Sequence, residues 1–400
     1  MSTVDVAEDK VEKAARVVQA IKDLRPFLEA NAPEGDKNRR SSQESVEALR
    51  DAGAFKIAVP GRFGGYETSI RNQLEVSAAV GQADGGLAWV TTLINVGAWL
   101  VGMQNEQLQS DIFGDDLNAR NVGVIAPSVT GRPVKGGYIV NGKGFYASGS
   151  LHATWGGNGA MLLDEDGNEA EQVMVFAPMS DLSVEDTWYV TGMRGSGSNC
   201  IIWDEVFVPN HRIFYTERIE SEGLPTPFKE ESLYRAPFSS VLALVLVGPQ
   251  LGIGRAALEY VQEQAHKKTI AYTTLGKQEN SVAFQVRIGK AAALIDIAET
   301  IAYDAADRLD RWAEVGYTPT KNERAQIRAV TASVVENITD ALNSLLFAHG
   351  SAGFAEKSPL QRYWRDSNVG ARHAFVLPDV SFESYGKTLL NIEEQIAPVL

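Results

Sequence analysis

Few side chains in this sequence can carry acid–base or nucleophilic chemistry near neutral pH. The chain has 400 residues but only five histidines and one cysteine. One histidine, His373, begins a short apolar run in the stretch RDSNVGARHAFV. An imidazole at such a place can act as a base, bind a metal or pack in the core. The residue alone does not decide between these roles, so the rest of the chain has to be considered.

Metal and hydrolase chemistry find little support. The sequence contains no HxxxH pair and no Cys/His cluster with zinc spacing. It also has no GxSxG nucleophile motif. Cys200 begins the alternating run CIIWDEVFVP, which favours a buried strand residue over a nucleophile. We therefore expect no metal site.

Two stretches combine glycine with polar side chains. GFYASGSLHATW (144–155) offers the hydroxyl of Ser148, the imidazole of His152 and the indole of Trp155. TWYVTGMRGSGSN (187–199) places glycines and hydroxyls around Arg194. Glycine-rich backbone can lie close to a flat or anionic ligand. Each stretch is a candidate ligand wall, and an ordinary tight turn remains the alternative.

Charge and hydropathy limit the partners. The formal net charge is −14, from 37 basic and 51 acidic residues, and there is no basic stripe. This balance argues against nucleic-acid binding and against an anionic membrane surface. We expect no apolar stretch of transmembrane length, no signal peptide and a cytoplasmic protein.

The hydrophobic pattern predicts an α+β protein with three regions. Residues 1–120 are expected to be helical, with a capping box that starts at Ser41 and a buried helix over 85–103. Residues 121–230 alternate like strands, and Asn141-Gly142 is expected to turn a hairpin. In 231–400, apolar residues recur every three or four positions, which predicts long helices packed in a bundle.

The chain resembles the acyl-CoA dehydrogenase superfamily over about residues 10–390. HGSAGFAEKSPLQRYWRD (349–366), PGRFGGYE and VGPQLGIGRAALEY carry the resemblance. It implies an N-terminal helical domain, a middle β-barrel or sandwich domain and a C-terminal four-helix bundle. It also implies a flavin between the last two domains and, usually, a homotetramer.

Several positions depart from the dehydrogenase pattern. Those enzymes need a carboxylate base, and the two usual sites match Ala374 and Val241 here, neither of which can accept a proton. The arginine that usually holds the flavin pyrophosphate aligns near Tyr272, and a glutamine position is Phe347. The adenine arm of FAD is therefore expected to be less well anchored.

The departures resemble a different branch, the flavin-dependent monooxygenases built on this fold. Its motifs match SGxxHAxW (148–155) and TWxxxGxRGSGS (187–198), and a histidine follows the Arg-Asp step, as His373 does. The resemblance implies the oxygenase component of a two-component system. A separate NAD(P)H-dependent reductase would supply reduced flavin, FADH2 or FMNH2. Reaction with O2 through a C4a-hydroperoxyflavin would then hydroxylate an aromatic substrate.

The same resemblance assigns roles to residues. Ser148 and His373 are the predicted catalytic residues, with Ser148 at the flavin N5 or the peroxide and His373 on the substrate side. Gly97 stands where related phenol hydroxylases carry a second histidine, and it is expected to open space for a bulkier or electron-rich substrate. The predicted cofactor-binding residues are Trp89, Pro127, Ser148, Gly149, Trp155, Arg194, Ser196, Phe284, Gln285, Gly350 and Ser351. The predicted substrate-binding residues are Gly97, Trp99 and His373.

Three other functions stay open at this level. An oxygenase of the same mechanism acting on nitrogen or sulfur is one, although the aromatic segment around Trp89 and Trp99 argues mildly against an amino sugar. A true dehydrogenase or oxidase with an unrecognised base is the second. A flavin-binding protein without enzymatic activity is the third.

Overall fold

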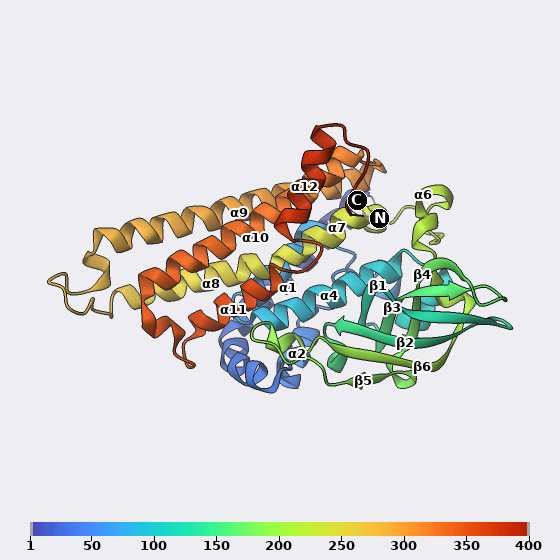
Figure 1. Cartoon of the computed structure of the whole chain (residues 1–400), viewed down its shortest axis with the longest axis horizontal. Coiled ribbons are helices and arrows are strands. Elements are labelled where there is room, and N and C mark those ends of the chain that lie inside the picture. The colour runs from blue at the N-terminus through green and yellow to red at the C-terminus, as the bar shows by residue number, and fades with distance from the viewer. Residues whose placement is uncertain (1–2, 398–400) are drawn as a thin grey trace.

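The computed structural model describes residues 3–397 and has a helical, then sheet, then helical order (Figure 1). This order confirms the predicted α+β architecture. The N-terminal helices are α1 (Thr3–Asn38), α2 (Gln43–Asp51), α3 (Ile70–Gly81), α4 (Gly85–Gly102) and α5 (Glu106–Phe113).

One helix start differs from the prediction. The N-cap of α2 is Ser42, whose side chain accepts the N–H of Ser45, and not Ser41. Ser41 instead donates its hydroxyl to the carbonyl of Gly195 at 2.9 Å. The Ser41 hydroxyl therefore makes a hydrogen bond to a distant part of the chain and does not cap the helix as the local pattern predicted.

A seven-stranded sheet follows, in the order β5-β6-β2-β1-β3-β4-β7. Its strands are β1 (Asn121–Val134), β2 (Gly137–Ala147), β3 (Trp155–Leu163), β4 (Glu169–Pro178), β5 (Ser183–Glu185), β6 (Asn199–Pro209) and β7 (Ile213–Phe214). The β1–β3 pair is parallel and the other pairs are antiparallel.

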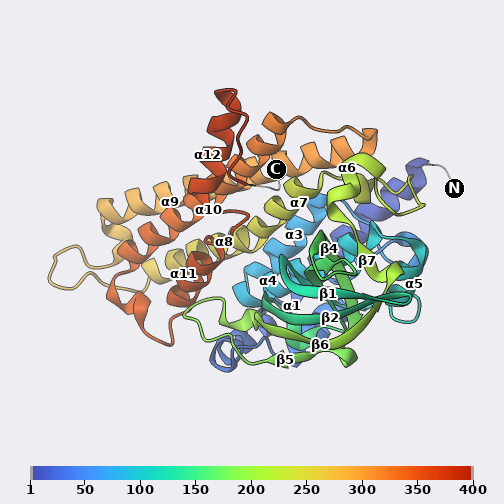
Figure 2. The same ribbon diagram turned by 45° about the vertical axis from the view of Figure 1, so that its right-hand side comes forward.

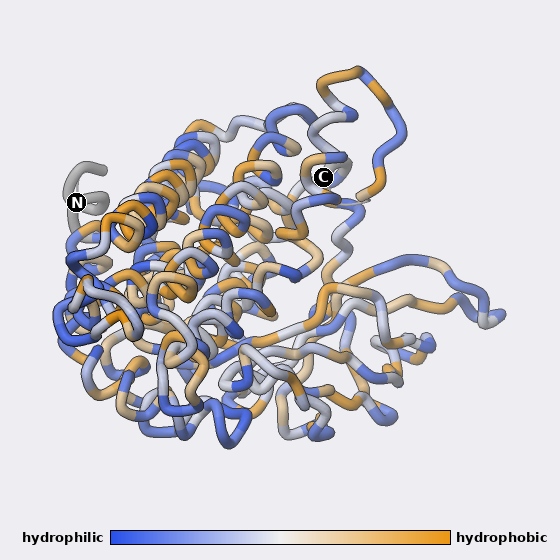
Figure 3. The backbone as a smooth tube through the Cα atoms, turned by 60° about the vertical axis from the view of Figure 1, so that its left-hand side comes forward, coloured by the Kyte–Doolittle hydropathy of each residue, from blue (hydrophilic) through white to orange (hydrophobic). Residues whose placement is uncertain are grey.

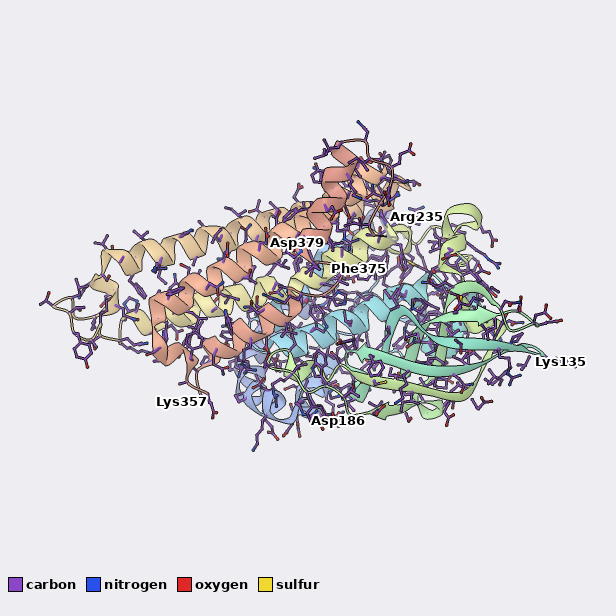
Figure 4. The ribbon with its side chains drawn as sticks, viewed as in Figure 1. Lys135, Asp186, Arg235, Lys357, Phe375 and Asp379 are labelled. Carbon is purple, nitrogen blue, oxygen red and sulfur yellow. The ribbon has the colours of Figure 1, made fainter. Side chains whose placement is uncertain are left out.

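The predicted hairpin turn at Asn141-Gly142 is wrong, because both residues lie inside β2. The turn between β1 and β2 uses Gly136, at φ +87°. Lys135 marks this turn at the end of the sheet away from the bundle (Figure 4). Asn141 instead donates its side-chain amide to Glu205 at 2.7 Å, beside a register shift between β2 and β6. Strand pairing over a long sequence distance thus overrides a local turn signal.

The C-terminal helices are α6 (Ile219–Glu222), α7 (Phe238–Leu244), α8 (Gly248–Ala265), α9 (Val282–Val315), α10 (Lys321–His349), α11 (Pro359–Gly370) and α12 (Pro378–Leu389). Helices α8, α9 and α10 run side by side, and α11 packs against α8 and α10 (Figure 1). The predicted apolar stripes are buried, and many of their members are alanines such as Ala298 and Ala302. Small side chains allow the helix axes to approach closely. Hydrophobic and hydrophilic residues are interspersed along the helical part of the tube in Figure 3.

Helix α4 connects the two halves of the molecule. It lies with α3 between the sheet and the bundle (Figure 2). Two segments, Gly85–Gly102 and Phe238–Ala265, are long and apolar enough to cross a membrane, so the expectation that none would be is wrong. Both are 94% buried inside the protein, as core helices are. Because α4 contacts both α8 and β1, its side chains can lie at the boundary between the bundle and the sheet.

Candidate active site

The predicted catalytic serine lies where helix α4 meets the sheet. Ser148 directly follows β2, and the chain turns there because Gly149 takes a left-handed conformation at φ +77°. The indole Nε1 of Trp89, on α4, donates to Ser148 Oγ at 3.1 Å. Both side chains are about 95% buried. A buried hydroxyl with a fixed donor on one side is thus presented at the boundary between helix and strand.

Two further serines extend this contact into a chain. Ser148 Oγ lies 2.7 Å from Ser198 Oγ, and Ser198 Oγ lies 2.7 Å from Ser196 Oγ. Ser196 donates to the carbonyl of Met193 at 2.7 Å. The backbone N–H of Gly149 donates to the carbonyl of Ser196 at 2.9 Å, which ties the two glycine-rich stretches together.

The peptide of Met193 is held in an unusual conformation. Its φ is +53°, a left-handed value that side chains with a Cβ rarely adopt. Its N–H donates to Asp366 Oδ1 at 2.6 Å, and its carbonyl also accepts from Trp188 Nε1 at 2.9 Å. Asp366 lies on α11, so the bundle fixes this loop of the sheet domain. Strain of this kind persists where the surroundings over-determine it, and it is common at functional sites.

The buried carboxyl of Asp366 is only partly ionised near pH 7. Burial, and then the nearby carboxyl of Asp84, raise its pKa to about 7, and the bond from Met193 offsets part of this rise. Asp84 caps α4 by accepting the N–H groups of Gly86 and Leu87. The two buried acids therefore lie at the junction of α4, α11 and the Met193 loop.

The ring of His373 packs at a tilted angle against the same indole that holds Ser148. Its ring centroid lies 5.6 Å from that of Trp89 and 5.9 Å from that of Phe375, which is nearly parallel to it. Phe375, labelled in Figure 4, comes from the segment between α11 and α12. Burial lowers the pKa of His373 to about 4, so the ring is neutral at pH 7. Its Nδ1 accepts the N–H of Phe375 at 3.3 Å, which places the proton on Nε2.

The tautomer of His373 decides whether its free ring nitrogen can act as a base or as a hydrogen-bond donor. Since Nδ1 is occupied by a backbone donor, the free nitrogen is an N–H donor and not a base. The geometry therefore favours orienting or polarising a ligand over taking its proton.

A break in the sheet makes backbone available near Pro127. The β1–β3 register shifts on both sides of Pro127, which leaves residues 125, 126 and 128 without a partner in β3. Pairing with β2 begins only at Val129. Residues 126–128 are exposed. An irregular, exposed strand segment can offer backbone groups to the polar edge of a flat heterocycle.

Some predicted cofactor residues are engaged elsewhere. Arg194 donates to the carbonyls of Asp36, Lys37 and Val190, and so clamps the loop to α1. Trp155, at the start of β3, is half-buried, with the guanidinium of Arg212 4.9 Å from its ring centre. Neither side chain makes a polar contact with the serine chain.

Four predicted cofactor residues lie far from Ser148 in the single chain. Phe284 and Gln285 belong to the first turn of α9, and Gly350 and Ser351 follow the end of α10. This end of the bundle projects away from the sheet (Figure 1). The chain on its own does not bring these residues to the serine site.

Two predicted substrate residues are packed in the core. Trp99 is fully buried, donates to the carbonyl of Leu233 at 3.0 Å and stacks on Phe238. The expectation that Gly97 opens space is wrong: a Cβ there would lie 1.9 Å from the carbonyl oxygen of Asn121. Glycine is needed because α4 and β1 touch at this point, and the argument for a bulkier substrate loses this support.

Sequence reasoning missed three parts of the site: Ser198, Met193 and Asp366. The alternating serines in RGSGS signalled the first, because residues two apart share a face in an extended segment. No local pattern signals the Met193–Asp366 contact. His152, the imidazole of the first glycine-containing stretch, is 5% exposed, and burial lowers its pKa to about 4.

The chemistry of these groups fits a flavin. Reduced flavin presents a flat tricyclic ring, an N5–H donor and a polar pyrimidine edge. Ser148 offers a buried hydroxyl, and the irregular, exposed segment around Pro127 offers backbone groups. Ser148 and the backbone near Pro127 are the groups that would hold it.

The chain is similar to known flavin-dependent enzymes. The family model for the acyl-CoA dehydrogenase C-terminal domain matches residues 244–378. The oxygenase subunit HsaA of a flavin-dependent monooxygenase from Rhodococcus jostii is 29% identical over 92% of this chain and 97% of the relative. Indole-3-acetate monooxygenase from Pseudomonas putida is 28% identical over 89% of each chain.

A solved structure extends the match to the whole chain. XiaF from Streptomyces sp., in complex with FADH2 and glycerol, is 32% identical, with a TM-score of 0.92, over 99% of this chain and 100% of that chain. Taken with the serine–tryptophan contact and the missing dehydrogenase base, this shows that the chain belongs to the flavin-dependent monooxygenases of the acyl-CoA dehydrogenase superfamily and is an oxygenase component that uses reduced flavin and O2.

Proposed function

We propose that this oxygenase hydroxylates a small aromatic compound of indole, polycyclic or phenolic type. The observation that carries the proposal is the arrangement of Trp89, Ser148 and His373. One indole donates to the buried hydroxyl and packs, tilted, against the neutral imidazole, so the group proposed to face the flavin and the group proposed to face the substrate share one support.

The reaction balances with one organic substrate. When bound, reduced flavin supplies the two electrons that activate O2. One oxygen atom enters the aromatic C–H bond to give a phenolic hydroxyl, the other leaves as water, and the flavin ends oxidised. Ser148 holds the N5 side of the flavin, while the Nε2–H of His373 orients the substrate or polarises the oxygen being transferred.

Aromatic rings support the substrate class. Trp89, His373 and Phe375 form a row of neighbouring rings beside the serine site, tilted between Trp89 and His373 and nearly parallel between His373 and Phe375. A flat, electron-rich substrate would find offset stacking partners there. Indole-3-acetate monooxygenase, a relative over most of its length, acts on such a ring by its name.

The two positions where a dehydrogenase usually carries its carboxylate base hold residues that cannot accept a proton. Val241 is completely buried among apolar side chains, and Ala374 contributes its carbonyl to Arg328 at 3.1 Å. Acyl thioester oxidation requires removal of an α-proton by a carboxylate. The site therefore favours oxygen transfer.

The test is oxygen incorporation. The protein is mixed with an NADH-dependent flavin reductase, FAD or FMN, and a panel of indoles and phenols under O2 enriched in the heavy isotope. The proposal expects a hydroxylated product that carries one heavy oxygen atom. NADH consumption that yields only hydrogen peroxide across the whole panel would contradict the substrate class. Labelled N-oxide or sulfoxide from amine or sulfide controls would favour the other oxygenase.

We also propose a homotetramer and a separate reductase. Large apolar side chains are exposed along α9 and the end of α10, among them Val282 (71%), Val286 (64%) and Phe347 (76%). Such a surface supports contact with another copy of the chain. It would also explain why Phe284 and Gly350 lie far from Ser148, since they could meet the flavin of a neighbouring subunit. Val286→Asp should lower the mass seen by sedimentation, whereas Val315→Asp, at an exposed helix end, should not.

A further inference from the structure

The hydroxyl chain from Ser148 to Ser196 has a fixed direction. At one end, the indole N–H of Trp89 can only donate. At the other end, the carbonyl of Met193 can only accept. Each hydroxyl between these ends has a single proton, so each proton can be assigned in turn.

The assignment starts at the carbonyl end. Ser196 gives its proton to Met193 at 2.7 Å, so the contact between Ser196 and Ser198 must use the proton of Ser198. The contact between Ser198 and Ser148 must then use the proton of Ser148. Ser148 Oγ donates once and accepts once from Trp89, which leaves one lone pair and no proton for a ligand.

The environment keeps this order in place. Ser148, Ser196 and Ser198 are 4%, 1% and 4% exposed, so water does not readily supply another partner. The Met193 carbonyl is further fixed because Asp366 holds the N–H of the same residue and Trp188 donates to the same oxygen. For Ser148 to donate outwards, the Ser196 hydroxyl would have to give up its bond to the Met193 carbonyl, which would keep only the N–H donors of Trp188 and Ser196.

The two redox states of flavin differ at the atom that matters. Reduced flavin carries a proton on N5 and can donate, whereas oxidised flavin has a lone pair there and can only accept. We propose that the Ser148–Ser198–Ser196 chain makes Ser148 an acceptor and thereby selects reduced over oxidised flavin at this site. This inference rests on the proposed placement of the flavin N5 at Ser148.

Such selectivity has a use in a two-component enzyme. The oxygenase must capture reduced flavin released by a separate protein and must release the oxidised product. A preference set by the protein's own proton order would assist both steps, and it needs no conformational change.

The experiment compares equilibrium binding of both redox states without catalysis. Dissociation constants for oxidised flavin are measured by fluorescence quenching, and those for reduced flavin by anaerobic equilibrium dialysis. The proteins are the wild type, Ser198→Ala, Ser198→Thr and Ser150→Ala. Ser150 is a matched control, because it is buried in the same turn but donates to the Gly197 carbonyl, outside the chain.

In Ser198→Ala, the proton of Ser148 is released towards the flavin. Oxidised flavin should bind roughly fivefold to tenfold more tightly, as expected for one neutral hydrogen bond, while reduced flavin changes little. Ser198→Thr keeps the hydroxyl and should restore the wild-type ratio, and Ser150→Ala should keep it. Ser196→Ala frees the Ser198 proton and should shift the ratio in the same direction. It replaces Ser198→Ala as the test if that variant does not fold.

Two outcomes would overturn the inference. The ratio of the two dissociation constants could stay at the wild-type value in both alanine variants, or Ser150→Ala could change it equally. Failure of the wild type to bind reduced flavin at all is a different result, because it would overturn the proposed function.

Discussion

Asp366 of the bundle accepts the backbone N–H of Met193 at 2.6 Å, across 173 positions of sequence. The contact joins α11 to the loop that carries Ser196 and Ser198. Asp366 thereby holds the residue at which the serine chain starts, and that chain ends at Ser148.

Removing the Asp366 acceptor should loosen the loop. In Asp366→Ala, the N–H of Met193 loses its partner and the left-handed conformation loses its support, so peptides covering 190–200 should exchange amide hydrogen faster. Asp366→Asn keeps an acceptor oxygen and should retain most of the protection. Equal protection in the wild type and Asp366→Ala would show that this bond does not hold the loop.

Asp366 should also make stability depend on pH. Its folded pKa of about 7 lies above the unfolded value near 4, so folding favours the protonated acid. Its contribution is therefore present at low pH and declines as pH rises from about 4 to 7, by on the order of 2–4 kcal/mol. In Asp366→Asn this decline should vanish. Urea unfolding at several pH values measures the difference between the two proteins, and identical pH profiles would contradict it.

Ser148→Ala should uncouple flavin oxidation from product formation. The variant loses the buried hydroxyl predicted to hold N5, so a larger share of O2 should leave as hydrogen peroxide. Trp89→Phe keeps an aromatic ring but removes the donor to Ser148, and it should shift the same ratio to a smaller extent. The ratio of product to peroxide measures both effects. Ser150→Ala is the control, and a peroxide yield equal to that of Ser148→Ala would argue against a specific role for the Ser148 hydroxyl.

His373 should act as a neutral donor. Because its pKa is about 4, no limb of the activity profile between pH 6 and 9 should arise from it. His373→Ala should lower the hydroxylation rate roughly tenfold to hundredfold with little change in reduced-flavin binding. Glutamine can place an N–H near the Nε2 position, so His373→Gln should recover more activity than His373→Asn. Equal rates for these two variants would contradict the assignment of the His373 proton to Nε2.

Gly97 should be intolerant of any side chain. In Gly97→Ala, the new Cβ would meet the Asn121 carbonyl at 1.9 Å, and moving β1 away from α4 should cost about 2–4 kcal/mol of stability. Gly289 is a control on α9, because a Cβ added there would have no other atom within 4 Å. Gly289→Ala should raise stability by about 0.5–1 kcal/mol through helix propensity. Thermal unfolding compares the two, and similar changes would contradict the close approach.

Elements with a strong local pattern could be predicted from the sequence. The apolar spacing from Phe284 to Leu309 predicts one helix, and α9 covers it because helical periodicity depends only on neighbouring residues. The Asn141-Gly142 signal failed for the opposite reason, since β6 supplied a partner strand that local sequence does not show.

The candidate site was predictable only where a motif carried it. Ser148 and His373 were predicted through resemblance, and the structure sets both beside Trp89, while their catalytic roles stay predictions. The direction of the serine chain depends on a carbonyl and a carboxyl from different elements, which no spacing rule connects. Gly97 shows the reverse error, because a missing side chain was taken as open space when the backbone of Asn121 fills it.

The reaction of the protein with O2 is the most direct test of Ser148 as the group that holds the reduced flavin. The complex with reduced flavin is mixed with oxygenated buffer in a stopped-flow instrument, and the absorbance of oxidised flavin is followed while O2 consumption is recorded. We predict a clear delay between O2 consumption and the return of oxidised flavin, shortened in Ser148→Ala but not in Ser150→Ala. Simultaneous O2 loss and flavin reoxidation in the wild type, at the rate of free flavin, would contradict this role.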